Sequence, residues 1–381
     1  MNLYRKLLIL FIVLITIYLI YRLIINRYKI YQLINKVDVE NFDLNNYDAP
    51  NVNSLATNNS VKLDIRPFPF SNMKKMGLKT DSSKELKQYC IKSAYNCIYD
   101  GEKCSTNMLL YVLSRGCRFL DLEVFYDESK TKAVLFAYSN TYTMSTEGID
   151  LPTVLDLINE YGFGSGCPNK TDPLFVQFRV KYSPSSDSNH NEDTVDINLK
   201  TIYNTLASAI KSSLTNRYSY GVVTSETPID SLANQIVVIM DLKNNRNFAN
   251  LSPELNKVVN MIAGSENMAK STYTDTQSMN KYTLSILKDG ITTDTDIIQE
   301  IVPTQTDNDT EMYMTDNFNA LTLLIDYSAN ITPMQFWHNG PELVKYETIF
   351  NKAGTGILPI ADAISYAERH NAEPSIIYPM I

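Results

Sequence analysis

This sequence lacks the cysteine pattern of a metal-binding or disulfide-stabilised protein. Its five cysteines include no C-x-x-C pair, so neither a zinc site nor a full disulfide framework is indicated; they are Cys90, Cys97, Cys104, Cys117 and Cys167. We therefore expect buried free thiols. Histidine is equally scarce, with three residues in the whole chain, at positions 190, 338 and 370.

The chain also lacks an excess of basic charge. Its 34 lysines and arginines face 42 aspartates and glutamates, which gives a net charge of −8. A negative global charge disfavours nucleic acid as a partner. The contents of 44% hydrophobic and 20% charged residues are ordinary for a globular protein, and 381 residues suffice for one large barrel or two smaller domains.

Charge is absent from the apolar run LLILFIVLITIYLIY at residues 7–21, which can extend to residue 25 if Arg22 reaches back to the interface. Bulky and basic residues follow it, not the small residues of a cleavage site, so we expect an uncleaved transmembrane helix over residues 7–25. Residues 1–36 would be the anchor and a basic stalk, and the polar residues 37–65 a linker. The excess of basic residues after the span favours a cytoplasmic globular part.

From residue 66 to 381 strand-like and helix-like patterns alternate. Apolar runs that predict strands lie at 119–126, 133–138, 174–182, 235–241, 321–327 and 332–337. Helical periodicity lies at 151–163, 201–214 and 252–264. Strands that alternate with helices favour an α/β fold with a mostly parallel sheet, of which a barrel is the preferred form. The polar stretches near 183–196 and 265–318 are interpreted as surface insertions.

The strand GCRFLDLEVFY, residues 116–126, carries two acids, Asp121 and Glu123, which share one face because they are two positions apart. Functional groups of a parallel barrel lie at the carboxyl ends of its strands. The predicted strand ends supply these candidates: Asp121, Glu123, Tyr138, Arg179, Lys181, Asp241, Asp326, Trp337 and His338.

Four segments in order resemble the X region of phosphoinositide-specific phospholipase C. They are IKSAYNCI (91–98), GCRFLDLEVFY (116–126), AVLFAYSN (133–140) and DPLFVQFRV (172–180), and residues 331–359 resemble the closing part of that barrel. The resemblance implies a distorted TIM-type (β/α) barrel and calcium-dependent cleavage of phosphoinositides. In the family, one histidine is the general acid and base, a second stabilises the pentavalent phosphorus, and an asparagine with three carboxylates binds Ca²⁺.

Carried over residue by residue, the family pattern is incomplete in this chain. Asn96 keeps the metal-binding asparagine, and Asp121 and Glu123 keep two acids in exchanged order. Tyr95 replaces the first histidine, and Ala137 or Tyr138 stands at the second. The last metal carboxylate falls on Arg179, which would repel Ca²⁺ and pair with Asp121 or Glu123. His338 is interpreted as an exposed loop residue.

Three hypotheses follow from the resemblance. The first is a catalytically degenerate, membrane-anchored barrel with a structural or interaction role and no cofactor. Barrels that lack the family histidines resemble uncharacterised proteins of large DNA viruses. That resemblance would place this chain in a virion or in a viral or host internal membrane, with other virion or membrane proteins as partners. The second is a retained phosphodiesterase that uses Ca²⁺, with Tyr95, Tyr138 or His338 as a substitute. The third is a phospholipid-headgroup binder that uses Arg179 and Lys181.

Overall fold

The computed structural model describes residues 85–101, 103–127, 132–135, 148–164, 167–180, 192–242, 247–273, 297–303, 317–338 and 340–364. All of them belong to the second of two units, Met1–Ala49 and Pro50–Ile381, into which the chain divides. The predicted membrane anchor and linker lie outside the described residues, as do Ala137, Tyr138, Lys181, His190 and His370. Within the described ranges no helix has both the length and the apolar character needed to cross a membrane.

Four parallel strands form the centre of the fold. β3 (Phe119–Asp127), β6 (Leu174–Val180), β7 (Ile236–Asp241) and β8 (Met261–Ala263) lie side by side in that order. On the other edge of β3, β2 (Ser93–Ala94) pairs in parallel with its start, and β4 (Lys132–Leu135) pairs antiparallel with its end. β5 (Ile149–Asp150) continues the sheet beyond β4. The prediction of a mostly parallel α/β sheet is therefore confirmed.

Backbone contacts connect the β8 edge of the sheet back to the segment just before β2. After a turn at Gly264, β9 (Met268–Thr272) continues from β8 and pairs in parallel with β10 (Ile298–Val302). β10 then makes a parallel bridge to Ile331, which bridges in parallel to Ile91, just before β2. The Asn330 side chain reinforces this closure, because its Nδ2 donates to the carbonyls of Lys87 (2.7 Å) and Tyr89 (2.8 Å). A turn and single bridges thus link the separate sheets into a ring.

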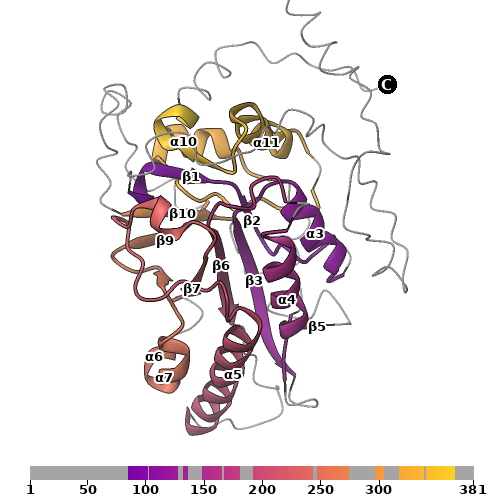
Figure 1. The fold of residues 1–381 in the computed structure, drawn as a ribbon, viewed down its shortest axis with the longest axis vertical. Helices are drawn as coiled ribbons and strands as arrows, with labels where there is room; N and C mark the ends of the chain where they lie inside the picture. Colours follow the sequence, from indigo (N-terminus) through magenta and orange to yellow (C-terminus); the bar gives the residue numbers. More distant parts are fainter. Residues whose placement is uncertain are drawn as a thin grey trace, which may run out of the picture. The chain divides into compact units, whose positions relative to one another are not determined.

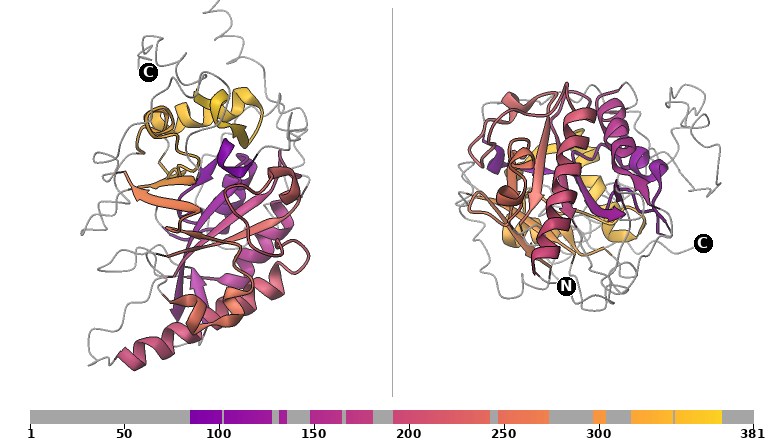
Figure 2. Two further views of the ribbon diagram at one scale, coloured as in Figure 1. Left: turned by 90° about the vertical axis from the view of Figure 1, so that its left-hand side faces the viewer. Right: turned by 90° about the horizontal axis from the view of Figure 1, so that it is seen from below.

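Helices cover the outside of this ring. α3 (Thr106–Ser114), α4 (Leu151–Tyr161) and α5 (Glu192–Ser213) follow β2, β5 and β6, and the short α6 (Phe248–Leu251) and α7 (Pro253–Asn256) follow β7. α10 (Ala320–Tyr327) and α11 (Pro341–Ala353) lie near β1 (Tyr89–Ile91), which pairs antiparallel with β11 (Ile357–Pro359) (Figure 1). The 3-10 turns η3 (Leu86–Gln88) and η4 (Ile229–Leu232) complete the described elements. Seen from below, α5 lies in front of the strands (Figure 2).

Side-chain alternation along β3 separates two cores. Leu120, Leu122 and Val124 join the large apolar cluster beneath the helices. Phe119 points the other way, into a smaller cluster inside the ring with Phe175 and Ile298 among others. Because successive strand residues face opposite sides, the two acids that follow Phe119 at two-residue steps also face the interior of the barrel.

Several predicted elements differ from the observed ones. Residues 321–327, predicted as a strand, lie in the helix α10, and residues 332–337 contain a bridge at Met334 but no strand. The helical pattern at 252–264 gives α7 and then the strand β8. The stretch 265–318, interpreted as an insertion, contributes β9 and β10 to the ring, and α5 begins at Glu192 within the other polar stretch. The expectation of free, buried cysteines is confirmed for all five.

The N-terminal cap of α10 can be tested by mutation, because the cap favours a helix over a strand in this segment. The Asn319 side chain accepts a hydrogen bond from the backbone N–H of Thr322 (3.1 Å). Asn319→Ala removes this bond and should lower the free energy of unfolding by about 1 kcal/mol, measured by urea denaturation of the full chain in detergent. Asn319→Asp keeps an acceptor oxygen and should stay within a few tenths of the wild type. An equal loss in both variants would contradict the capping role.

Candidate functional site

The two acids of β3 lie in the barrel interior around one cation. Asp121 and Glu123 are completely buried, and the neighbouring strand places Arg179 opposite Glu123 in the parallel register. The Arg179 guanidinium donates from Nε to Asp121 Oδ1 (2.7 Å) and from Nη2 to Asp121 Oδ2 (2.6 Å). Its Nη1 donates to Glu123 Oε1. The prediction that Arg179 pairs with these acids is confirmed.

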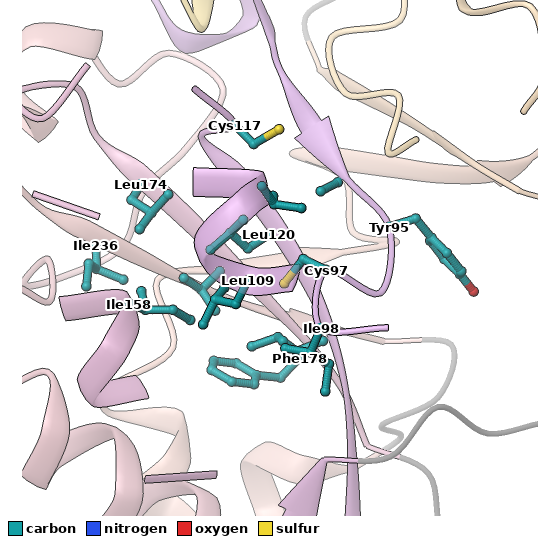
Figure 3. Close-up of a cluster of buried hydrophobic side chains, with 14 of the residues drawn as sticks. Tyr95, Cys97, Ile98, Leu109, Cys117, Leu120, Ile158, Leu174, Phe178 and Ile236 are labelled. Carbon is teal, nitrogen blue, oxygen red and sulfur yellow. The ribbon is translucent and has the colours of Figure 1, made fainter. Parts of the chain in front are cut away.

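Tyr95 covers the flat face of this guanidinium. The Arg179 Cζ atom lies 4.6 Å from the centre of the Tyr95 ring, a cation–π contact between two buried side chains. Figure 3 shows Tyr95 turned away from the neighbouring core residues Cys97, Ile98 and Leu109. The position that holds the first histidine in the family pattern therefore holds an aromatic ring packed on the arginine.

Asn96 is held close to the same acids by its backbone. Its φ of 41° is in the left-handed region that asparagine tolerates better than most residues, and its side chain is buried. Its backbone N–H donates to Asp121 Oδ2 (3.0 Å), and the Cys97 N–H donates to the Asp121 carbonyl (3.0 Å). Asn96 thus lies beside the acid pair, where the sequence placed it.

A second group of charges continues from Asp121 around the ring. Gln177 Nε2 donates to Asp121 Oδ1 (3.1 Å) and to Glu300 Oε1 (2.9 Å). Lys270 Nζ lies 3.3 Å from Asp241 Oδ2 and 3.7 Å from Glu300 Oε1. The interior network therefore includes side chains of β3, β6, β7, β9 and β10.

Electrostatics in this network depend on the arginine. Burial alone would raise the pKa of Asp121, but the charge and hydrogen bonds of Arg179, with help from Lys270 and the Asn96 N–H, hold this pKa below its ordinary value. Burial would likewise lower the pKa of Arg179, yet the charges of Asp121 and Glu123 raise it well above its ordinary value. Both groups therefore stay charged at neutral pH.

Glu300 behaves in the opposite way. Burial raises the pKa of Glu300 to about 7, and the negative charges of Asp241 and Asp121 add to this effect, against the opposing charge of Lys270. Its Oε2 atom is buried with no hydrogen-bond partner. A carboxyl group in this position readily takes up a proton.

The residues present do not fit the Ca²⁺ ion that the family pattern implies. Ca²⁺ needs six to eight oxygen ligands. Here both oxygens of Asp121 and one of Glu123 are engaged by a guanidinium that supplies nitrogen donors only. Across the described residues, no group of three or more histidine, cysteine, aspartate or glutamate side chains is arranged to hold a metal ion. A cation of the protein itself lies between the acids.

The other predicted strand ends do not all reach this network. Asp326 lies on the helix α10, not at a strand end. Trp337 packs edge-on against Tyr99, with ring centroids 5.0 Å apart. His338 is half-buried, not exposed as expected, and its backbone N–H and carbonyl are held by Gln335 and Asn317. Tyr138 and Lys181 lie outside the described residues.

Sequence reasoning missed three members of the network: Gln177, Lys270 and Glu300. Gln177 is two positions before Arg179, so the two-residue period of a strand places both side chains on one face. Glu300 is two positions after Ile298, so it shares the face of β10 that carries this inner-core residue. The signal for Lys270 and Glu300 was hidden because their strands are five residues long within a mostly polar stretch.

Removal of the central cation should destabilise the barrel strongly. Arg179→Met leaves two buried carboxylates without their cation, and we expect a loss of about 3–5 kcal/mol in the free energy of unfolding at neutral pH. The pKa of Asp121 should then rise, so the loss should shrink as the pH is lowered toward 5. Chemical denaturation of the full chain at several pH values measures this.

A matched variant separates charge from packing in that experiment. Arg179→Met combined with Asp121→Asn and Glu123→Gln has no buried charge at these three positions, so it should recover much of the lost stability and its pH dependence. If the triple variant is as unstable as Arg179→Met, the cost comes from lost shape and not from unpaired carboxylates.

Glu300 predicts a pH dependence of its own. Its ordinary pKa is 4.5 and its pKa in the folded barrel is about 7, so the folded chain binds a proton that the unfolded chain has released. This contribution to the free energy of unfolding is present at low pH and is lost as the pH rises from 4.5 to about 7. Glu300→Gln should flatten the fall in melting temperature between these values, whereas the exposed control Glu226→Gln should not. An unchanged slope in Glu300→Gln would contradict the assignment.

Comparison with known proteins gives a family match. Residues 82–219 match the family described as phosphatidylinositol-specific phospholipase C, X domain. A comparison with curated proteins found no match.

Several solved structures are similar to part of the chain. PLC21 from S. officinalis is 15% identical, with 74% of this chain and 37% of that chain covered, at a TM-score of 0.49. PLC21 from L. pealei is 17% identical, with 75% and 38% covered, at 0.49. A calcium-dependent phosphoinositol-specific phospholipase C from Pseudomonas sp. is 10% identical, with 73% and 96% covered, at 0.40.

The chain spans little more than a third of the length of the two PLC21 proteins. The family match contains Asn96, Asp121, Glu123 and Arg179 and covers all four motifs in full. Residues 82–219 therefore match the same family, the phospholipase C X domain, that the sequence motifs resemble.

Proposed function

We propose that this protein is a catalytically degenerate barrel of the phospholipase C kind, attached to a membrane by its N-terminal segment, with a structural or interaction role. One observation carries the proposal: the Arg179 guanidinium lies between Asp121 and Glu123 and contacts both. In the family pattern these acids bind a catalytic cation. Here the same charges are neutralised by a side chain that cannot coordinate a substrate oxygen as Ca²⁺ does.

The residue at the position of the family's general base also supports a loss of catalysis. Tyr95 stands at the first histidine position and is buried against Arg179. A neutral tyrosine with an ordinary pKa of about 10 is a weak base at neutral pH. The barrel therefore offers neither the cation nor the base at the positions where the family chemistry needs them.

Arg179 is also poorly placed to bind a lipid headgroup. It is 1% exposed, and its Nε, Nη1 and Nη2 atoms all donate to carboxylates. A phosphate would have to displace two buried acids to reach it, which makes the headgroup hypothesis the weaker alternative.

Membrane attachment rests on the apolar residues 7–25 and stays a prediction. A place in a virion or in a viral or host internal membrane is likewise a prediction. Both are tested by membrane fractionation and by co-purification of partners from the native source, with a chain that lacks residues 7–25 as the control.

An activity assay tests the central claim. The full chain in detergent should release no inositol phosphate from phosphatidylinositol or its bisphosphate, with calcium or with chelator, while a calcium-dependent phospholipase C in parallel does. Asn96→Ala serves as the matched variant. Calcium-dependent release that Asn96→Ala abolishes would overturn the proposal.

Restoration of an acid at position 179 should create a response to calcium. Arg179→Glu places a third carboxylate beside Asp121, Glu123 and Asn96, a set of oxygen ligands suited to Ca²⁺. This variant should be less stable than the wild type without calcium, and millimolar calcium should raise its melting temperature by several degrees.

Two controls accompany this variant. The wild type should show no calcium-dependent shift, and neither should Lys257→Glu, a charge reversal at a side chain that is 66% exposed. An equal calcium shift in the wild type would mean that Arg179 does not replace the ion.

A further inference from the structure

An aromatic loop at residues 218–222 displays apolar side chains to solvent. Tyr220 and Val222 are each 80% exposed, more than any other large hydrophobic residue in the described ranges. The Tyr218 and Tyr220 rings lie next to each other, with centroids 4.8 Å apart. Two adjacent aromatic rings and a valine make a small apolar surface.

This loop is held in place by hydrogen bonds to the side chain and backbone of Asn260. Asn260 Nδ2 donates to the carbonyls of Ser219 (2.9 Å) and Gly221 (2.8 Å), and the Val223 N–H donates to the Asn260 carbonyl (2.9 Å). Gly221 has a φ of +91°, a conformation that glycine adopts without strain. Because the loop is already ordered, a ligand that binds it loses little additional entropy from the loop.

The chain enters the barrel beside this loop. Glu85 bridges to Pro228, and the Leu86 N–H donates to the Thr227 carbonyl (2.9 Å). Pro228 is six residues after Val222, a separation of at most about 20 Å. Residues that precede Glu85 are therefore tethered close to the aromatic loop.

The preceding sequence contains a segment suited to such a surface. Residues 67–70 read Pro-Phe-Pro-Phe, in which each proline restricts its own backbone and that of the residue before it to extended conformations. Pro-rich extended segments dock on aromatic surfaces in proteins because they are ordered in advance.

The tether is long enough for this contact. The 14 residues 71–84 separate Phe70 from Glu85 and can span up to about 46 Å, with a typical end-to-end distance of about 20 Å. A short tether gives an effective concentration of the order of millimolar, so a weak contact is enough. Glu226 and Asp230 are exposed nearby, which disfavours an anionic lipid surface as the occupant.

We propose that the aromatic loop (residues 218–222) is the docking surface for residues 67–70 of the same chain. The two phenylalanines would cover Tyr220 and Val222, and the contact would fix the segment before Glu85 against the barrel. This is an interaction surface on a different part of the barrel from the buried acid network and does not depend on its chemistry.

Disulfide trapping tests the contact directly in the full chain. Phe68→Cys with Val222→Cys should form an intrachain disulfide several-fold faster than the control pair Phe68→Cys with Ile197→Cys, in which the second site is 63% exposed on α5. The five native cysteines are all buried. Equal rates in the two pairs would overturn the proposal, and so would a disulfide between two copies, which would make a second chain the occupant.

Proteolysis gives a second, independent readout. Trypsin can cut after Lys74 and Lys75 in the tether, and docking should slow these cuts. Tyr220→Ser with Val222→Ser should speed them several-fold, and Phe68→Ser with Phe70→Ser should do the same, without further effect when all four changes are combined. Ile197→Ser should leave the rate unchanged, and melting temperatures will show that the variants fold. Unchanged cleavage in both double variants would overturn the proposal.

Discussion

The pairing of Arg179 with Asp121 and Glu123 is the interaction on which the barrel interior depends. Two carboxylates on one strand face are costly to bury, because each loses its hydration and repels the other. A planar guanidinium with donors in a fixed fork satisfies both at once. Tyr95 completes the arrangement by covering one face of the cation, and all four side chains are buried.

A second buried ion group stabilises another part of the fold. Lys92 Nζ donates to Glu347 Oε1 (3.0 Å), and Arg115 Nε donates to the same oxygen (2.7 Å). Lys92 precedes β2, Arg115 follows α3 and Glu347 lies on α11, so these charges join the beginning of the barrel to its last helix. The barrel interior thus combines an apolar cluster with charged groups whose partners come from distant parts of the chain, and its correct closure is a condition for their pairing.

The sequence predicted what depends on local pattern and missed what depends on register. Long apolar runs identified β3, β6 and β7, and the two-residue spacing placed Asp121 and Glu123 together. The short, mostly apolar segment 321–327 fits a strand and a helix equally well, and the Asn319 cap favours the helix. Glu300 and Lys270 could not be placed, because their meeting with Gln177 depends on which short strands become neighbours in the ring.

The closure of the ring has a consequence for covalent modification. Asn330 begins the sequence Asn-Ile-Thr, the acceptor pattern for N-linked sugars. In the folded barrel its amide nitrogen donates to two backbone carbonyls and its side chain is 1% exposed. A sugar could be attached there only before the last strands meet the first, and the attached sugar would then keep them apart. Folding and glycosylation at this residue therefore exclude each other.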